Sequence, residues 1–303
     1  MFSPIIALFC LALASCLTKA SSLANHSSYG TISTRTIAEG VVRATFNNAP
    51  IKLLDKKLAT DLRDLLVDLN STEEVKVVIF DSANPDFFIA HTDVRLLDAQ
   101  DSPPSDTNPA EIVGSFVEAT RLLSTVNFIT IAEVNGRAHG LGSEMALQCD
   151  MWFAGPNALF SQSENSIGIF PAAGAVPFLV KLIGRAWTSE YVLAARGVDA
   201  ATTERIGWVN TAYASKDVLT ANVDKLAKKI ALFPRQSLIA TKISINYDRR
   251  KEDDLDNDVA TIKRLITTSA AQDLMTKFIG LTGNFSKKKS ELDMPYDLQK
   301  LYE

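Results

Sequence analysis

The chain has 303 residues, of which 47% are hydrophobic and 22% are charged. This is the composition of a globular protein that is long enough for one large domain with an appendage, and it excludes an intrinsically disordered chain. The formal net charge of -4 and the pI near 5.5 give no reason to expect nucleic acid or an anionic membrane as a partner.

Residues 1–20 have the pattern of a secretory signal peptide. The apolar run from Ile5 to Leu17 carries no charge and is too short to span a bilayer comfortably, and Ala20 before Ser21 offers a small-residue cleavage site. We therefore expect the secretory pathway, with an uncleaved anchor or an intracellular location as alternatives. Cleavage would leave Cys149 as the only cysteine and no membrane span in the mature chain.

The first half of the chain predicts alternating strands and helices. Residues 21–38 are rich in Ser, Thr and Asn and predict a linker, and leucines from Leu54 to Leu69 recur at the spacing of an amphipathic helix. Further elements follow in chain order, namely strands at 40–46, 75–80 and 128–134 and a helix at 111–124. The repeated order of two strands and a helix indicates an α/β fold of stacked ββα units.

The second half becomes helical. Short strands at 151–154 and 158–160 precede predicted helices at 173–183, 186–196, 199–204, 217–232, 236–246 and 254–279. Strands vanish after about residue 215, so we divide the chain into a core at 39–215 and a helical region at 216–303. The tail from Leu281 onward is expected to be loose.

A glycine-rich turn links the strand at 128–134 to a helix. The strand ends at Asn135-Gly136, glycines follow at 140 and 142, and the helix opens at Ser143-Glu144. Glycine lets a ligand approach the backbone, and the first N–H groups of a helix lack an internal acceptor, so this turn can receive a developing negative charge. Glu144 is thus a candidate catalytic residue, although such a carboxylate is often only a helix cap.

A second acidic residue, Glu164, lies between apolar runs at 158–160 and 167–171. A buried carboxylate tends to have a raised pKa, which suits proton transfer, but Glu164 alone is equally consistent with a loop residue that points to water. The segment from Phe88 to Val94 places Asp93 after small residues, and its simpler interpretation is a capped helix start.

Three segments together resemble the crotonase (enoyl-CoA hydratase/isomerase) superfamily. Residues 88–94 are similar to its Phe-x-Ala-Gly-x-Asp motif, residues 136–150 to its Gly-x-Ala-x-Gly-Gly-Gly-x-Glu motif, and residues 163–174 to its Pro-Glu-x-x-x-Gly-x-x-Pro-Gly-x-Gly motif. The resemblance runs from about Gly40 to Asn246. It implies a crotonase-like stacked ββα spiral core with a C-terminal helical trimerisation region, and a homo-trimer or hexamer.

The resemblance also implies a mechanism. The backbone N–H groups of Thr92 and Leu141 would form an oxyanion hole for a thioester carbonyl, and Glu144 and Glu164 would flank a water. The implied reaction is hydration of a 2-enoyl-CoA. Isomerisation of an enoyl-CoA is an alternative, and so is a binding protein that keeps the fold without the catalysis.

Substrate contacts follow from the same motifs. The resemblance implies that seven residues bind the acyl-CoA, namely Lys52, Leu54, Ala90, Asp93, Val94, Ser163 and Ala172. Lys52, with Lys56 and Lys57, would contact the phosphates, although a solvated helix face explains these lysines nearly as well. Coenzyme A is expected only as part of the substrate, with no permanently bound cofactor. No spacing of His, Cys and Asp predicts a metal site.

The motifs also depart from the family pattern. His91, Leu141 and Ala172 stand where the family has glycine, and Ser163 stands where it has proline. These substitutions fit either a changed substrate or a loss of activity, and the second reading motivates the binding-protein alternative. His91 and His139 are candidates for an additional acid or base, or for polar groups that only pack.

Overall fold

The computed structural model describes residues 29–98, 109–247, 252–283, 285 and 288–303. The predicted signal peptide and residues 21–28 of the predicted linker lie outside this part of the chain. Within the described ranges, every helix is too short or too polar to cross a membrane.

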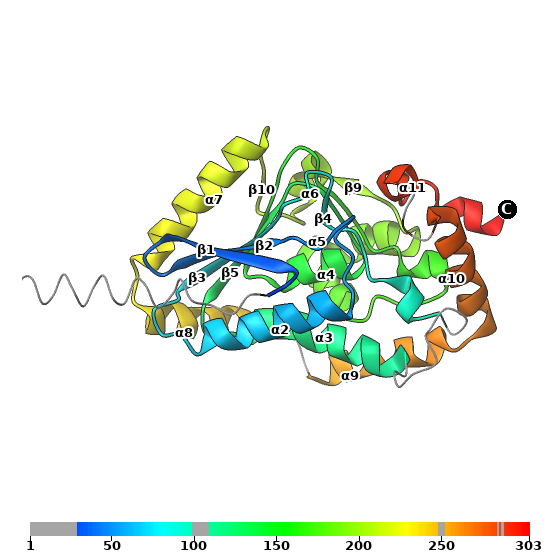
Figure 1. Cartoon of the computed structure of the whole chain (residues 1–303), viewed down its shortest axis with the longest axis horizontal. Helices are drawn as coiled ribbons and strands as arrows, with labels where there is room; N and C mark the ends of the chain where they lie inside the picture. Colours follow the sequence, from blue (N-terminus) through cyan, green and yellow to red (C-terminus); the bar gives the residue numbers. More distant parts are fainter. Residues whose placement is uncertain (1–28, 99–108, 248–251, 284, 286–287) are drawn as a thin grey trace, which may run out of the picture.

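Two sheets form the centre of the molecule (Figure 1). In the larger sheet, every neighbouring pair from the second strand onward is parallel. Its six strands, in spatial order, are β1 (Ile32–Ala38), β2 (Val41–Phe46), β3 (Val77–Ser82), β5 (Ile129–Val134), β7 (Met151–Ala154) and β10 (Thr211–Ala212). The smaller sheet consists of β4 (Phe87–Ile89), β6 (Arg137–His139), β8 (Leu159–Ser161) and β9 (Val198–Asp199).

Successive strands alternate between the two sheets. The pairs β3–β4, β5–β6 and β7–β8 each place one strand in the large sheet and one in the small sheet. Helix α3 (Pro109–Thr125) follows the first pair, and α4 (Leu141–Gln148) follows the second. This arrangement confirms the predicted stacked ββα spiral.

The predicted linker at 21–38 is wrong for its described part. Residues 32–38 form β1, which pairs antiparallel with β2. The β-branched side chains of Ile32, Thr34 and Thr36 favour a strand, and Ile32 is only 2% exposed. The core therefore begins earlier than residue 39.

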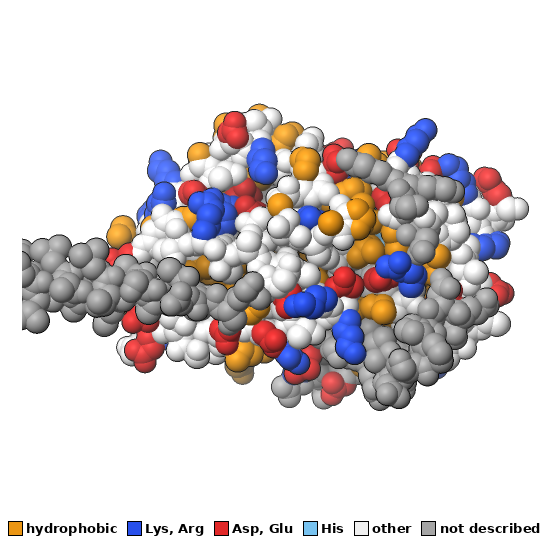
Figure 2. All heavy atoms as spheres, viewed as in Figure 1, with side chains coloured by type: hydrophobic (Ala, Val, Ile, Leu, Met, Phe, Trp, Pro, Cys, Tyr) orange, Lys and Arg blue, Asp and Glu red, His pale blue; other side chains and the backbone are white. Residues whose placement is uncertain are grey.

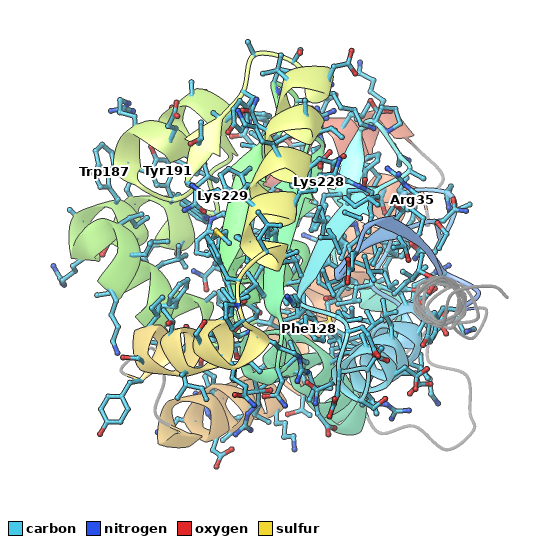
Figure 3. All side chains as sticks on the ribbon, turned by 90° about the vertical axis from the view of Figure 1, so that its left-hand side faces the viewer. Arg35, Phe128, Trp187, Tyr191, Lys228 and Lys229 are labelled. Carbon is cyan, nitrogen blue, oxygen red and sulfur yellow. The ribbon has the colours of Figure 1, made fainter. Side chains whose placement is uncertain are left out.

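Helices cover both faces of the large sheet. On one side, α2 (Lys56–Asn70) buries Leu58, Leu62 and Leu66, and Asp55 caps its first turn through the N–H of Leu58. On the other side, α7 (Lys216–Ala231) packs Leu219, Val223 and other apolar side chains against Val41. Helix α7 crosses in front of the strands in Figure 3, and α8 (Arg235–Asn246) lies below it.

A buried ion-pair network fixes α7 on the sheet. Arg43 of β2 is 1% exposed and contacts Asp81 at 2.6 Å, Glu133 at 2.8 Å and Asp224 at 2.6 Å. Glu133 lies on β5 and Asp224 on α7. Removing one member of such a network leaves the remaining charges buried without compensation, so the network specifies how these elements pack.

The C-terminal region differs from its prediction in two places. The helix expected at 254–279 is two helices, α9 (Glu252–Ile266) and α10 (Ser269–Thr282), because the Thr268 side chain caps α10 by accepting from the N–H of Ala271. The tail is not loose: it forms α11 (Lys288–Asp293) and a short 3-10 helix, η4 (Leu298–Tyr302).

The remaining helices close the spiral. Helix α5 (Ala175–Leu193) spans both helices expected at 173–196 and is interrupted at Gly184, whose φ is 80°, and α6 (Ala200–Ile206) follows it.

On the face shown in Figure 2, Lys and Arg side chains are interspersed with Asp and Glu, and apolar side chains gather to the right of centre. Charges of one sign therefore do not dominate this face.

Candidate active site

The start of α4 packs directly against the end of β4. Gly140, the residue before the helix, has a φ of 52°, and a Cβ on Gly142 would lie 2.3 Å from the carbonyl oxygen of Ile89. Only glycine allows this approach. It brings the first turn of α4, where the Leu141 N–H has no acceptor within the helix, next to the segment that follows β4.

Thr92 lies in that segment. Leu54 N–H donates to His91 O at 2.9 Å, and Asp93 N–H donates to Leu54 O at 3.2 Å. Because successive N–H groups of an extended chain point to opposite sides, the Thr92 N–H points away from Leu54. Thr92 and Leu141 both line the same pocket, as the predicted oxyanion hole requires.

Glu144 lies in the first turn of α4 and is 1% exposed. Its Oε2 atom accepts a hydrogen bond of 2.9 Å from the backbone N–H of Ala173. This contact joins α4 to the loop before α5, so the Glu144 carboxylate is held in one orientation at the pocket wall.

Glu164 begins a short 3-10 helix, η3 (Glu164–Ile167), and its carboxylate lies against Gly140, where a Cβ would come within 2.5 Å of Oε1. Burial raises the pKa of Glu164 to about 7, although a backbone N–H and the charge of His91 act in the opposite direction. A group with this pKa can both give and take a proton near neutral pH.

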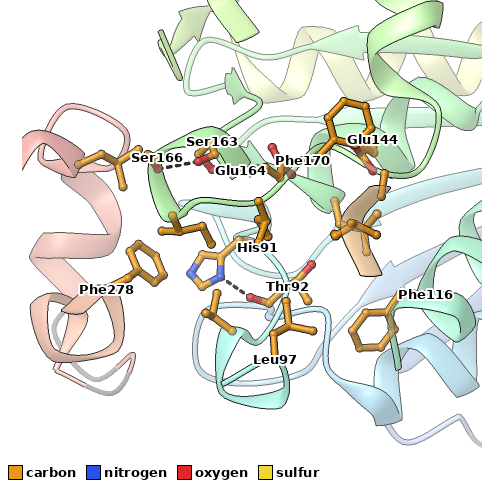
Figure 4. Close-up of a pocket in the computed structure, with 18 of the residues that line it drawn as sticks. His91, Thr92, Leu97, Phe116, Glu144, Ser163, Glu164, Ser166, Phe170 and Phe278 are labelled. Atoms are coloured by element: carbon orange, nitrogen blue, oxygen red, sulfur yellow. Dashed lines mark hydrogen bonds between the residues drawn. The ribbon is translucent and has the colours of Figure 1, made fainter. Parts of the chain in front are cut away.

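The two glutamates share one pocket with a volume of about 70 Å³ (Figure 4). Three predicted substrate contacts, Val94, Ser163 and Ala172, also line it. Ala172 is not among the described non-glycine residues with positive φ, so it replaces glycine without backbone strain. The pocket wall is mainly apolar and includes Leu97, Phe116, Val117, Ile167, Ile169 and Phe170.

Four predicted substrate contacts do not line this pocket. Leu54 is 1% exposed and supports Thr92 from behind, and the Ala90 N–H donates to Lys52 O. Asp93 pairs with Arg95 at 2.7 Å and accepts from its N–H. The Lys52 side chain is 5% exposed, and burial lowers its pKa, so it is poorly placed to meet a phosphate in solvent.

The two candidate histidines differ. His139 is fully buried, with Nδ1 2.7 Å from Ser161 Oγ, and it does not line the pocket. Burial, together with the charges of His91 and Arg137, lowers its pKa to about 3, so His139 is neutral at physiological pH. His91, in contrast, lies at the pocket wall below Glu164 (Figure 4).

Sequence reasoning missed the C-terminal wall of the pocket. Ile262 of α9, Phe278 of α10, Met294 and Leu298 line it from the region that was predicted to form an oligomerisation surface and a loose tail. The apolar residues Met294, Leu298 and Leu301 among tail charges were the available signal. Within the described ranges, no group of three or more His, Cys, Asp or Glu side chains could hold a metal ion.

The fold is a ββα spiral that brings Glu144, Glu164, Thr92 and Leu141 to one mainly apolar pocket, which is the arrangement expected of the crotonase class of proteins. Residues 36–289 match the family model of enoyl-CoA hydratase/isomerase. The chain belongs to this family.

Individual relatives are similar to the chain at modest identity. A short-chain-enoyl-CoA hydratase of Clostridium acetobutylicum is 27% identical over 80% of this chain and 92% of its own length. The 2,3-dehydroadipyl-CoA hydratase of Escherichia coli is 29% identical over 78% of this chain and 86% of its own length. The chain spans little more than half of two further relatives, probable mitochondrial enoyl-CoA hydratases of Arabidopsis thaliana (56%) and Dictyostelium discoideum (55%).

Solved structures share the fold. A crystal structure of a provisionally assigned enoyl-CoA hydratase from Streptomyces avermitilis has a TM-score of 0.79 and 29% identity, and the match covers 91% of this chain and 99% of that one. Pseudomonas aeruginosa DspI has a TM-score of 0.67 and 28% identity, with 75% and 90% covered.

The raised pKa of Glu164 predicts a pH-dependent stability. The folded state keeps this proton up to about pH 7, whereas the unfolded state releases it near pH 4.5, so the Glu164 carboxyl destabilises the fold as pH rises through this window. We expect the advantage of Glu164→Gln over wild type in unfolding free energy to grow by about 3 kcal/mol between pH 4.5 and pH 8.

Urea unfolding at one protein concentration measures this difference. Glu204→Gln, at an exposed position on α6, is the control and should show no such trend. An advantage of Glu164→Gln that stays constant with pH would contradict the raised pKa.

Proposed function

We propose that this protein adds water to the double bond of a 2-enoyl-CoA thioester. The observation that supports this most is that Glu144 and Glu164, from separate turns of the spiral, line one pocket together with Thr92 and Leu141, whose backbone N–H groups would form the oxyanion hole. Membership of the enoyl-CoA hydratase/isomerase family agrees with it.

In the proposed reaction, the thioester carbonyl accepts hydrogen bonds from the Thr92 and Leu141 N–H groups. Negative charge that develops on this oxygen meets donors already in place, and each such donor stabilises the transition state by about 3–4 kcal/mol. A water between the carboxylates adds its oxygen to the β carbon of the acyl chain. Glu144 takes a proton from this water, and Glu164, with a pKa of about 7, delivers a proton to the α carbon.

The pocket wall favours an uncharged acyl chain, because the described residues that line it include no Lys or Arg and are mainly apolar. Coenzyme A would enter as part of the substrate, and no permanently bound cofactor is proposed. Of the three lysines considered for its phosphates, Lys52 is buried and Lys57 is ion-paired with Asp61. Lys56, exposed in the first turn of α2, is the better candidate.

Glu144→Ala and Glu164→Ala should each lower the rate of hydration of crotonyl-CoA by at least about 100-fold, because each removes a proton-transfer group. Loss of the conjugated thioester absorbance measures this rate. Glu190→Ala, at an exposed position on α5, is the control and should retain the wild-type rate. Wild-type turnover in both active-site variants would exclude the mechanism.

The same assay separates the alternatives. Conversion of a 3-enoyl-CoA that survives in Glu144→Ala and stops in Glu164→Ala would favour an isomerase, because migration of the double bond can use one carboxylate. Saturable binding of an acyl-CoA without turnover by the wild type would favour the binding-protein reading, which the substitutions at 91, 141 and 172 motivate.

We also propose that the protein is a homo-trimer or a dimer of trimers that associates through α8. Ile243, Ile245 and Tyr247 are 63%, 75% and 88% exposed, which is unusual for large apolar residues so close together. Lys242, the residue before Ile243, fixes α8 to the core, since its Nζ contacts Phe128 O at 2.9 Å and Asp150 at 2.8 Å. Figure 3 shows Phe128 next to α8.

Ile243→Glu should therefore shift the protein from trimer toward monomer, because it places a charge in a contact that buries apolar surface. Sedimentation velocity measures the change. Val67→Glu is the matched control, since Val67 is 55% exposed on α2, and it should leave the assembly intact. A monomeric wild type at micromolar concentration would refute the assembly.

We propose that residues 1–20 direct the chain to the secretory pathway, on the strength of the apolar run from Ile5 to Leu17. N-terminal sequencing of the native protein should find a chain that begins at Ser21. A chain that begins at Met1 in a cytosolic fraction would instead favour an intracellular location, where coenzyme A is available.

A further inference from the structure

A histidine occupies a buried position beside the candidate oxyanion hole. His91 is 5% exposed, and its ring packs against Phe278 and Phe285 with centroid distances of 5.4 and 5.3 Å. Figure 4 shows the ring between Phe278 and Thr92. The family motif has glycine here, so the side chain is an addition that the mechanism above does not use.

Both ring nitrogens of His91 face oxygen acceptors. Nδ1 lies 2.6 Å from the carbonyl oxygen of Thr92, which can only accept, so Nδ1 carries a proton. Nε2 lies 3.0 Å from Oε2 of Glu291, whose side chain is 0% exposed. Burial lowers the pKa of His91, but the Glu291 carboxylate and the Thr92 carbonyl more than offset this, and the net pKa is raised.

These contacts restrain the backbone on both sides of the Thr92 N–H. The carbonyl before it, His91 O, accepts from Leu54 N–H at 2.9 Å, and the carbonyl after it, Thr92 O, accepts from the His91 ring. Because adjoining peptide groups share the Thr92 Cα, fixing both carbonyls fixes the direction of the N–H that points into the pocket.

Glu291 belongs to the segment that closes the pocket. It lies on α11, and Met294 and Leu298, a few residues farther on, line the cavity. Three further contacts hold this segment: Arg137 Nε donates to Leu292 O at 2.8 Å, Lys277 Nζ donates to Leu301 O at 2.7 Å, and Tyr302 Oη donates to Ser166 O at 3.0 Å. Of these contacts, only the one made by Glu291 involves His91, the residue before Thr92.

We propose that Glu291 is a positioning residue that, through a buried ion pair with His91, orders the Thr92 peptide of the oxyanion hole and couples it to closure of the acyl pocket by the C-terminal segment. This proposal rests on the proposed hydratase function. The charged and titratable groups that face His91 are Glu291 of α11, Asp93 of its own loop, Glu164 of η3 and His139 of β6.

The ion pair also acts on the proton-transfer group. The positive charge of His91 lowers the pKa of Glu164 against the larger effect of burial. Neutral His91 would remove this influence, so the pKa of Glu164 would rise. A residue that only packed the tail would not produce this change.

The test uses Glu291→Gln, His91→Asn and the double variant. Each single variant should lower kcat for crotonyl-CoA about 10- to 100-fold with little change in KM, the loss expected for one charge-assisted hydrogen bond that acts on the transition state. The pH limb of kcat/KM that reports Glu164 should move upward in both. The double variant should be no slower than the slower single variant, because both remove one interaction.

Two matched variants control for folding. Glu291→Asp keeps the charge and should recover part of the lost kcat and the wild-type pH limb. Glu190→Gln removes a carboxylate from the exposed pair with Arg196 and should change nothing. Single variants that raise KM but keep the wild-type kcat, with an unmoved pH limb and effects on KM that add in the double variant, would show that the pair only packs the tail and would overturn the proposal.

A readout independent of turnover separates this proposal from the hydratase assignment. In wild type, the imidazole nitrogens of His91 should both be protonated at pH 7 by NMR, and Glu291→Gln should leave only one protonated. A singly protonated His91 in wild type would overturn the ion pair. Absence of turnover with a doubly protonated His91 would instead refute the hydratase function and keep the pair.

Discussion

The close approach of Gly140 and Gly142 to their neighbours is the constraint on which the site depends. A side chain at 140 would overlap the Glu164 carboxylate, and one at 142 would overlap the Ile89 carbonyl. Without these glycines, α4, η3 and the end of β4 could not meet. Their meeting gives a helix N-terminus and two carboxylates a common cavity, and the burial that follows raises the pKa of Glu164. The packing of these three elements, the position of the backbone donors and the raised pKa of Glu164 therefore all depend on the lack of side chains at residues 140 and 142.

Features that depend on local sequence could be predicted. The strand and the helix on either side of the glycine turn at residues 135–142 follow from residue types at short spacing, although the short strand β6 inside the turn was not predicted. The pairing of Glu144 with Glu164 was implied by the family resemblance, and both residues line one pocket. The strand at 32–38 was mistaken for a linker because its Ser and Thr residues suit loops as well as edge strands. Its role is decided by antiparallel pairing with β2, which begins only three residues after β1 ends, and the Glu39-Gly40 turn between the two strands was the signal that was missed.

The tail shows the limit more clearly. The tail was predicted to be loose, yet Glu291 within it is 0% exposed, because it pairs with His91, which lies 200 residues earlier in the chain. An acidic residue between a run of lysines and Asp293 carries no local sign of burial. Residue type alone also does not reveal how the fold accommodates the substitutions at 91, 141 and 172. The His91 ring packs against two phenylalanine rings, and Ala172 keeps an ordinary backbone conformation.

Because Met294 and Leu298 complete the cavity wall, the site is complete only when residues 294–298 are in place. During synthesis, both sheets and the two glutamates leave the ribosome long before η4 does. A nascent chain can therefore form both sheets while the pocket still lacks the wall that Met294 and Leu298 provide. Emergence of residues 294–298 from the ribosome, rather than formation of the sheets, marks the moment at which the pocket can close.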